Sequence, residues 1–236
     1  MSGSIAAYAG NVSGTVAEAP FATITDSGTN VLFGIDGIAL DASGKIYVAN
    51  GTTDSALTFA ANPSGTVNEA PLATITGSNT GLQGAGIALD TGGKIYVANP
   101  AGLGSVTVYA ANPSGTITGP GSPTTPNSTG LGGPDAVAVD ASGKIYVANY
   151  YISSVTVYAA NPTGTLDEAP LATIAGSNTG LDAPTGIAVD ASGKIYVVNN
   201  GSGTVTIYPA NPSGTLNETP LATITGLSGA AAVAVH

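Results

Sequence analysis

The stretch "GIAVDASGKIYVVN" (residues 186–199) decides the fold. Its two apolar runs, 186–190 and 194–199, are rich in β-branched residues and too short for helices, so both are predicted to be strands. Between them, the side chain of Asp190 can accept a backbone N–H, and Gly193 can adopt the positive φ that a tight hairpin needs. The stretch therefore predicts an antiparallel β-hairpin.

Similar segments begin at residues 37, 86, 136 and 232. Together with the segment that begins at residue 186, their starts are 46 to 50 residues apart. Each complete period also holds two further runs, such as "TVTIYPA" (204–210) and "PLATITG" (220–226), which are joined by a turn segment such as "ANPSGT" (210–215). No segment keeps a helical period of 3.6 residues, so the chain is predicted to be all-β. A sheet of four short antiparallel strands, repeated about every 45 residues, is typical of a β-propeller blade.

The two ends of the sequence are predicted to build one blade together. Residues 2–25 match residues 202–225, which hold the third and fourth runs, whereas "AVAVH" (232–236) matches the first run. We expect a single domain, residues 1–236, with five blades of four-stranded antiparallel sheets, the last of them shared between the N- and C-termini. This last blade lacks a "KIYVAN" strand, and three alternatives stay open: it closes with three strands, the missing residues lie outside this sequence, or a second molecule fills the position by self-association.

The phrase that recurs resembles the NHL-repeat signature, in which a strand ending in Asp turns through a Gly into a strand of the "IYVAD" type. The resemblance extends through nearly the whole chain and implies a β-propeller. Members of that family usually have six blades, whereas five copies of the first run favour five here. Asn50, Asn99, Asn149 and Asn199 stand where the family pattern has an acid. Related sequences include lactonase-like and antibiotic-lyase enzymes, sensor ectodomains and binding modules, so the resemblance does not select a function.

Composition excludes several classes of function. Only 8% of residues are charged, the four basic residues are all Lys, and the formal net charge is −10. Such a surface would repel nucleic acid and anionic membranes, and no run approaches the ~20 apolar residues of a membrane span. The absence of Cys excludes disulfides and thiolate metal sites and fits an exported bacterial protein. We therefore expect an extracellular, cell-surface or periplasmic location, although the N-terminal residues do not resemble a signal peptide.

The loops after the second run and before the first run vary between periods and are predicted to lie on one face of the ring. Tyr150 and Tyr151 are adjacent aromatic residues in these loops, suited to stacking on a sugar ring or a peptide. The alternative is that one tyrosine packs over the neighbouring blade. Asp135, Asp182 and Asn149 lie nearby and complete the candidate ligand site.

Acidic residues suggest a second kind of site. Asp36, Asp135 and Asp182 could converge on the axial channel and hold Ca²⁺ through carboxylate oxygens. Because no bidentate Glu and no ligand-spacing motif accompanies them, the alternative is that each Asp caps a local turn, and no cofactor is then expected. The Asp that ends each first run is interpreted as a turn residue: Asp41, Asp90, Asp140 and Asp190.

Catalysis has little support, and we assign no catalytic residue. His236 is the sole His of the sequence, so a Ser-His-Asp arrangement has no suitable base. The predicted function is a non-catalytic binding, adhesion or scaffold propeller that recognises a carbohydrate or a protein partner on the loop face. Two alternatives remain: an engineered or purely structural repeat scaffold without a ligand, and a lactonase- or lyase-like enzyme.

Overall fold

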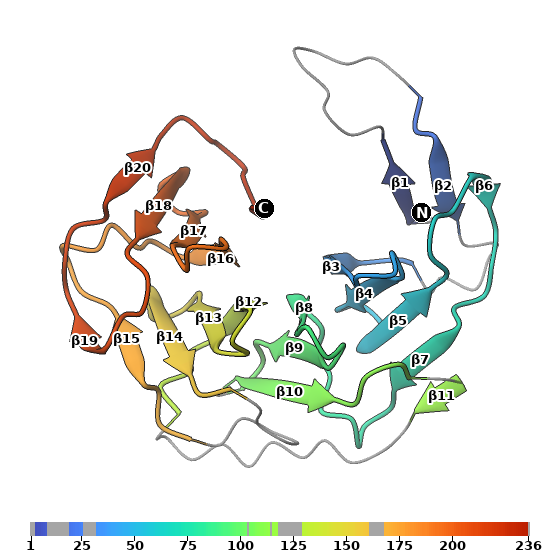
Figure 1. The fold of residues 1–236 in the computed structure, drawn as a ribbon, viewed down its shortest axis with the longest axis horizontal. Helices are drawn as coiled ribbons and strands as arrows, with labels where there is room; N and C mark the ends of the chain where they lie inside the picture. Colours follow the sequence, from blue (N-terminus) through green and yellow to red (C-terminus); the bar gives the residue numbers. More distant parts are fainter. Residues whose placement is uncertain are drawn as a thin grey trace.

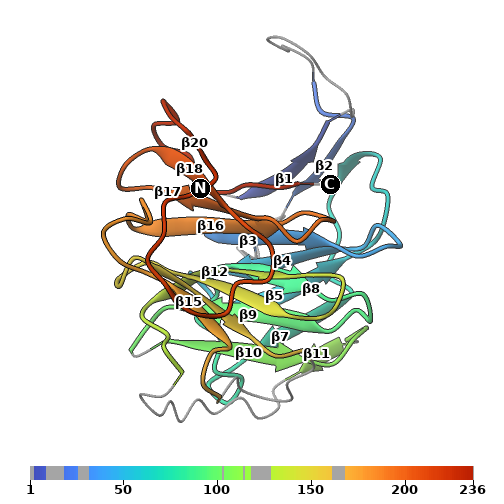
Figure 2. The same ribbon diagram turned by 60° about the vertical axis from the view of Figure 1, so that its left-hand side comes forward.

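The computed structural model describes residues 3–8, 19–25, 32–102, 104–113, 115–117, 129–160 and 168–235. Every helix or strand in this part of the chain is a β-strand, so the prediction of an all-β protein is confirmed. The strands form successive sheets arranged around a centre, in the manner of a β-propeller (Figure 1). In the view turned by 60°, the sheets of successive blades stack face to face (Figure 2).

Four blades follow the sequence repeat, and we number them 1 to 4 in chain order. The inner strands are β3 (Ile35–Leu40), β8 (Ile87–Leu89), β12 (Pro134–Val139) and β16 (Pro184–Val189). The second strands are β4 (Ile46–Asn50), β9 (Ile95–Asn99), β13 (Ile145–Asn149) and β17 (Ile195–Asn199). The third strands are β5 (Ser55–Phe59), β10 (Ser105–Tyr109), β14 (Ser154–Tyr158) and β18 (Thr204–Tyr208). The fourth strands of blades 1, 3 and 4 are β7 (Ala73–Thr76), β15 (Ala172–Ile174) and β20 (Ala222–Ile224).

These four runs pair antiparallel with their neighbours within a blade, as the hairpin pattern predicts. Ahead of blade 1, β1 (Ser4–Ala7) pairs antiparallel with β2 (Ala22–Thr25), and these match the third and fourth runs of the repeat. In blade 2, the Pro-rich segment 120–128, which is a poor candidate for an outer strand, lies outside the described residues.

In blades 1, 2 and 4, a further described strand links the sheet to the one before it. The prediction that the "ANPSGT" segments are only turns is wrong, because a strand of three residues follows the turn. These strap strands are β6 (Gly65–Val67), β11 (Gly115–Ile117) and β19 (Gly214–Leu216). They pair parallel with the outermost strand of the preceding sheet: β6 with β2, β11 with β7, and β19 with β15. Neighbouring blades are therefore joined by backbone hydrogen bonds as well as by side chains.

The core lies between the blades. Eight aliphatic residues of the second strands are buried in it: Ile46, Val48, Ile95, Val97, Ile145, Val147, Ile195 and Val197. Successive side chains of a strand point to opposite faces, so each second strand contributes to two layers. In the layer between blades 3 and 4, Tyr146 and Ala148 of one blade pack with Ile195 and Val197 of the next. Burial of such an aliphatic side chain contributes roughly 1.5–3 kcal/mol, so these layers hold the ring together.

The C-terminal end occupies the position of an inner strand without forming one. Residues 231–235 contain no strand, so the closing strand predicted at 232–236 is not formed in the described residues. Ala231 and Ala232 nevertheless lie against Gly186 of β16, as the start of β8 lies against Gly37 of β3. Figure 1 shows an opening between this end and β1. The number of five blades stays a prediction.

Candidate functional site

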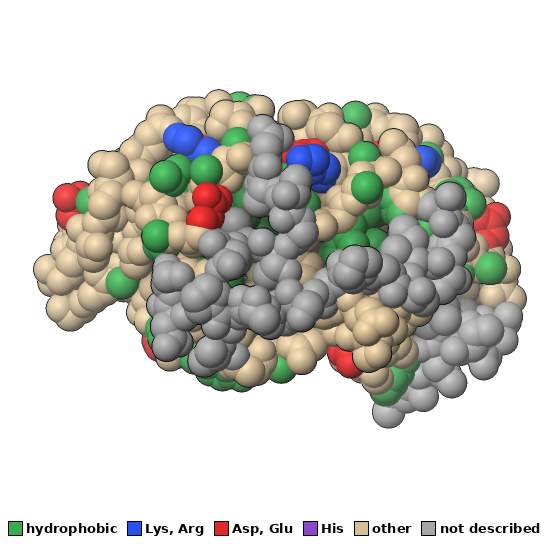
Figure 3. Space-filling model, turned by 90° about the horizontal axis from the view of Figure 1, so that it is seen from below, with side chains coloured by type: hydrophobic (Ala, Val, Ile, Leu, Met, Phe, Trp, Pro, Cys, Tyr) green, Lys and Arg blue, Asp and Glu red, His purple; other side chains and the backbone are tan. Residues whose placement is uncertain are grey.

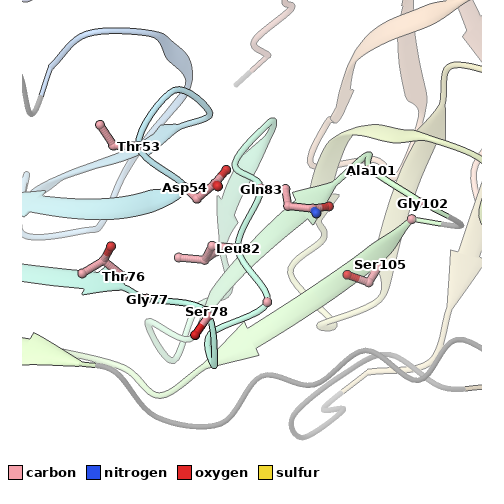
Figure 4. A pocket seen from close by; sticks show the side chains of 12 residues that line it. Thr53, Asp54, Thr76, Gly77, Ser78, Leu82, Gln83, Ala101, Gly102 and Ser105 are labelled. Carbon is pink, nitrogen blue, oxygen red and sulfur yellow. The ribbon is translucent and has the colours of Figure 1, made fainter.

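Loops of blades 1 and 2 enclose a hollow of about 640 Å³. The loop after β4, the segment before β8 and the loop after β9 all contribute to its wall, so the variable loops do share one face, as predicted. Figure 4 shows residues from the two sides of this hollow: Thr53, Asp54 and Thr76 on one, Gln83, Ala101 and Ser105 on the other. Its hydroxyl, amide and carboxylate groups can donate and accept hydrogen bonds with a polar ligand.

A buried asparagine fixes the loops of each blade. The last residue of every second strand is an Asn with no exposed surface. In blade 3, Asn149 Oδ1 accepts a hydrogen bond from Gly132 N (3.1 Å), and Nδ2 donates to Ser154 Oγ (3.3 Å) and Thr156 Oγ1 (3.1 Å). The interpretation of Asn149 as a ligand contact is therefore wrong, because its side chain is inaccessible. It ties the loop before the inner strand to the third strand, β14.

Tyr150 and Tyr151 form an exposed aromatic step in the loop after β13. The rings meet edge to face, with centroids 5.4 Å apart and planes at 83°. Their exposed fractions are 38% and 70%, and the neighbouring Ile152 is also exposed. The backbone N–H groups of the two tyrosines donate to the carbonyls of Gly133 and Gly132 over 2.8 and 3.1 Å. The main chain thus holds both rings on the surface, where they present apolar faces and polar hydroxyls.

The aromatic step adjoins the hollow. A Cβ atom placed on Gly104, in the wall of the hollow, would lie 2.2 Å from the Pro134 ring. A Cβ atom placed on Gly133 would lie 2.2 Å from the ring of Tyr151. At the boundary between blades 2 and 3, Gly104 thus packs against Pro134. Gly133, which precedes Pro134 in the chain, packs against the ring of Tyr151.

A second hollow, of about 540 Å³, is lined by the inner strands of the blades. The inner strands of blades 1, 3 and 4 each contain a β-bulge near their start. The bulged residues are Asp36, Asp135 and Thr185, and all three line this axial cavity. A β-bulge redirects a side chain relative to the regular strand, so rigid strands position these three polar groups.

The two carboxyl groups in the axial cavity influence each other. Burial raises the pKa of Asp135 to about 6, and the charge of Asp36 adds to the rise. Burial also raises the pKa of Asp36, whose Oδ2 accepts a hydrogen bond from Gly51 N at 3.0 Å. Thr185 Oγ1 is buried and has no hydrogen-bond partner among the described residues. The wall of the cavity therefore contains a carboxyl group with a pKa of about 6 and a buried hydroxyl group without a described hydrogen-bond partner.

The predicted cluster of three Asp residues is not found. Asp36 and Asp135 share the axial cavity, but Asp182 is exposed in a loop, where its carbonyl accepts a hydrogen bond from Gly201 N (3.2 Å). Within the described ranges, no group of three His, Cys, Asp or Glu side chains could hold a metal ion. Thr185 was not predicted as a site residue, although in the aligned repeats it stands where Asp36 and Asp135 stand.

The recurring Asp residues are turn residues, as predicted. Asp140 Oδ1 accepts hydrogen bonds from Ser142 N (2.8 Å) and Lys144 N (3.0 Å), and Tyr146 Oη donates to Asp140 Oδ2 (2.9 Å). Equivalent bonds occur at the other three hairpins, so this turn has a structural role in every blade.

The surface is poor in charge. Figure 3 shows single acidic and basic side chains scattered among uncharged ones on the side it presents. In the part of the chain that the structure describes, no helix is long and apolar enough to cross a membrane.

Solved structures with a similar fold include the following two chains. A chain in the crystal structure of a nidogen/laminin complex has a TM-score of 0.55 and 21% identity, over 86% of this chain and 68% of that one. Virginiamycin B lyase from Staphylococcus aureus has a TM-score of 0.50 and 12% identity, over 75% of this chain. This chain spans about half, 52%, of the lyase. At these identities the likeness shows the fold alone.

No curated protein matches the sequence. A protein family described as "Lactonase, 7-bladed beta-propeller" matches residues 73–230. The described strands of this chain form four blades and an N-terminal strand pair. The family description names seven blades, whereas the sequence repeats predict five. The match covers more than half of the sequence, and the chain therefore belongs to the lactonase family of seven-bladed β-propellers.

Proposed function

We propose that this protein is a binding module that recognises a neutral, polyhydroxylated ligand, a carbohydrate, on its loop face. The observation that carries the proposal is the exposed Tyr150–Tyr151 step beside the polar hollow of blades 1 and 2. Aromatic rings stack on the apolar faces of sugar rings, while hydroxyl and amide groups bond to sugar hydroxyls.

The rigidity of the site supports this proposal. The backbone N–H groups of the two tyrosines donate to the carbonyls of Gly133 and Gly132. The N–H of Gly132 in turn donates to the side chain of the buried Asn149, so the loop that holds the tyrosines is itself held in place. A surface that is ordered before binding loses little conformational entropy when a ligand arrives. The shortage of charge on the protein also suits a neutral ligand better than an ionic one.

A glycan-array screen tests the proposal with the wild type, a Tyr150→Ala/Tyr151→Ala variant and a Tyr8→Ala control. Tyr8 is an exposed tyrosine outside the loop face, so its removal controls for loss of aromatic surface. We expect the wild type and the control to bind the same glycans and the double variant to lose at least tenfold in affinity. Absence of binding by the wild type, or equal binding by the double variant, would leave the scaffold alternative.

A second candidate function rests on the carboxyl pair of the axial cavity and on the family match. In a lactone hydrolysis, the Asp36 carboxylate would accept a proton from the attacking water, while neutral Asp135 would donate its proton to the ring oxygen that leaves. The high pKa of Asp135 suits the role of acid. The test is hydrolysis of simple γ- and δ-lactones by the wild type and by Asp135→Asn, with Asp182→Asn as control. Activity unaffected by Asp135→Asn would exclude this site.

The location and the partner of the module are part of the same proposal. We place the protein outside the bacterial cytoplasm, at the cell surface or in the periplasm, where glycans are accessible. A protein ligand is the alternative occupant of the loop face, and the nidogen/laminin complex is an instance of a similar fold in a protein assembly. Fractionation of the source cells, followed by immunodetection, tests the location.

A further inference from the structure

Blade 2 departs from the spacing of the repeat in both of its segments that border the hollow of blades 1 and 2. Between the second and third strands, blade 2 has five residues (100–104), whereas blades 1, 3 and 4 have four: 51–54, 150–153 and 200–203. Ahead of the inner strand, five residues separate Thr80 from Gly86, while six separate the equivalent Thr179 from Gly186. The described pairing of β8 accordingly contains no bulge. The near-identical repeats thus differ in length in the walls of this hollow.

Asp54 is the one charged side chain among the described residues that line the hollow. It lies on the wall opposite Gln83 and Ser105 (Figure 4). Its carboxylate forms no hydrogen bond or ion pair with another described residue, so both oxygens are available to a ligand. The backbone at Asp54 has a φ of 47°, a conformation that an Asp adopts at a cost relative to glycine.

The residues equivalent to Asp54 show what this position does in the other blades. The residue before the third strand has a positive φ in all four: Asp54, Gly104, Ser153 and Gly203. In blades 2 and 4 it is a glycine and has no side chain to offer. In blade 3, Ser153 Oγ accepts a hydrogen bond from Ala183 N (3.1 Å) and so joins the loops of blades 3 and 4. Asp54 makes no such bond, so a structural role of this kind does not account for it.

The groups around Asp54 determine which ligand suits the hollow. A carboxylate accepts hydrogen bonds and donates none, and its two oxygens can accept from two adjacent hydroxyl groups of one sugar ring. Bonds to a charged acceptor are roughly twice as strong as bonds between neutral groups. Neutral donors and acceptors complete the polar part of the wall: Thr53, Thr76, Ser78, Gln83 and Ser105. No Lys or Arg is among the described lining residues, so an anionic ligand would be repelled by Asp54 without compensation.

We propose that Asp54 determines the specificity of the loop face: its carboxylate binds two adjacent hydroxyl groups of a neutral sugar and excludes sugars that carry a carboxylate or sulfate group. The inference rests on the proposed function, which makes the loop face a carbohydrate site, and it adds the residue and the charge that select the ligand. At about 640 Å³, the hollow lies within the range of small-molecule sites, about 300–1,000 Å³, so it has room for a sugar ring.

Titration calorimetry tests the proposal with oligomers of glucose, galactose and mannose. Each oligomer is compared with its C6-oxidised form, in which the CH₂OH groups have become carboxylates. We expect the wild type to bind at least one neutral oligomer ~10-fold or more tightly than the oxidised form. Asp54→Asn should bind that neutral oligomer ~10-fold more weakly and should lose most of the discrimination against the oxidised form. Glu218→Gln should match the wild type, because it removes one exposed negative charge ahead of β20, outside the hollow.

Ala101→Phe tests whether the ligand occupies the hollow itself. Ala101 is exposed in the wall of the hollow, so the larger side chain takes up space there. Ala191→Phe is the control, since it adds the same ring at an exposed position of the hairpin between β16 and β17. We expect Ala101→Phe to weaken the binding of every oligomer ~10-fold or more and Ala191→Phe to leave it unchanged. Circular dichroism shows whether each variant keeps its β-structure.

The outcomes separate this inference from the proposed function. A wild type that binds none of the oligomers would overturn the inference, and if it also binds no glycan on the array, the proposed function fails with it. Equal binding of neutral and oxidised oligomers, or binding that Asp54→Asn leaves unchanged, would overturn the inference alone. So would unchanged binding in Ala101→Phe, because the ligand would then lie outside the hollow. In these two cases, loss of binding in Tyr150→Ala/Tyr151→Ala would still support a carbohydrate site on the loop face.

Discussion

Asp36 and Asp135 face one axial cavity from the bulges of blades 1 and 3, and the charge of Asp36 contributes to the high pKa of Asp135. The Asp36→Asn variant should therefore lower the pKa of Asp135, although burial will keep it above the usual range for Asp. Carbon-13 NMR titration of the side-chain carboxyl groups measures this change. Asp182→Asn is the matched control, since Asp182 is exposed in a loop away from the cavity, and it should leave the titration of Asp135 unchanged.

Stability should fall as the pH rises through the titration of Asp135. The pKa of an Asp in an unfolded chain is about 3.9, and in the folded protein that of Asp135 is about 6. Between these values the folded state holds a proton that the unfolded state has lost, so the free energy of unfolding decreases with rising pH. Above the folded pKa, the full cost of burying the charge remains.

The Asp135→Asn variant isolates this effect. It removes the charge and keeps the size of the side chain, so its melting temperature should exceed that of the wild type at pH 8. At pH 4, where Asp135 is protonated in the folded protein, the two should differ little. Differential scanning calorimetry at both pH values measures the change. The same offset at pH 4 and at pH 8 would contradict the assigned pKa.

Asn149→Ala should destabilise the ring by about 2 kcal/mol or more, because it leaves buried donors and acceptors without partners. The amide of Gly132 and the hydroxyl groups of Ser154 and Thr156 would lose their bonds to this side chain. Urea denaturation monitored by circular dichroism measures the change in the free energy of unfolding. Asn200→Ala, at the exposed position that follows the equivalent Asn199 of blade 4, should change stability by less than about 0.5 kcal/mol.

Gly133→Ala should displace the ring of Tyr151, since the new methyl group would lie 2.2 Å from it. Gly133 also has a φ of 64°, which costs free energy for an alanine. Gly229→Ala controls for that strain, because Gly229 has a φ of 78° and its new methyl group would meet no atom within 4 Å. Proton NMR of the Tyr151 ring and glycan binding should change only in Gly133→Ala. If both substitutions changed the Tyr151 ring signals and glycan binding equally, backbone strain and not the contact with the Tyr151 ring would be the cause.

Local patterns were sufficient to predict the blades. The alternation of apolar residues and the Asp-Gly turn of residues 186–199 specify a hairpin through contacts close in sequence, and burial of Ile195 and Val197 follows from the same pattern. The strap strands could not be predicted in this way. A three-residue run such as Gly65–Val67 has too little periodicity to mark a strand, and its partner β2 lies 43 residues away, between Ala22 and Gly65.

The site was predicted only in part for a related reason. Tyr150 and Tyr151 are recognisable as exposed because they stand in a variable loop. The bulges that direct Asp36, Asp135 and Thr185 into the axial cavity each add one residue to a strand, and simple alternation does not reveal that addition. Asn149 is polar and ends a strand, which favours a surface position, but hydrogen-bond partners in the loop before β12 and in β14 make its burial favourable.

The strap strands make the unit that recurs in the sequence different from the unit that folds as a sheet. In the described residues, the repeats of blades 1, 2 and 4 each contain strands of their own blade and the outermost strand of the sheet before it. A duplicated segment of the gene would therefore encode its own attachment to whichever copy precedes it. Copies could be gained or lost inside such an array without the evolution of a new junction, and the near-identity of the repeats in this chain is consistent with growth by that route.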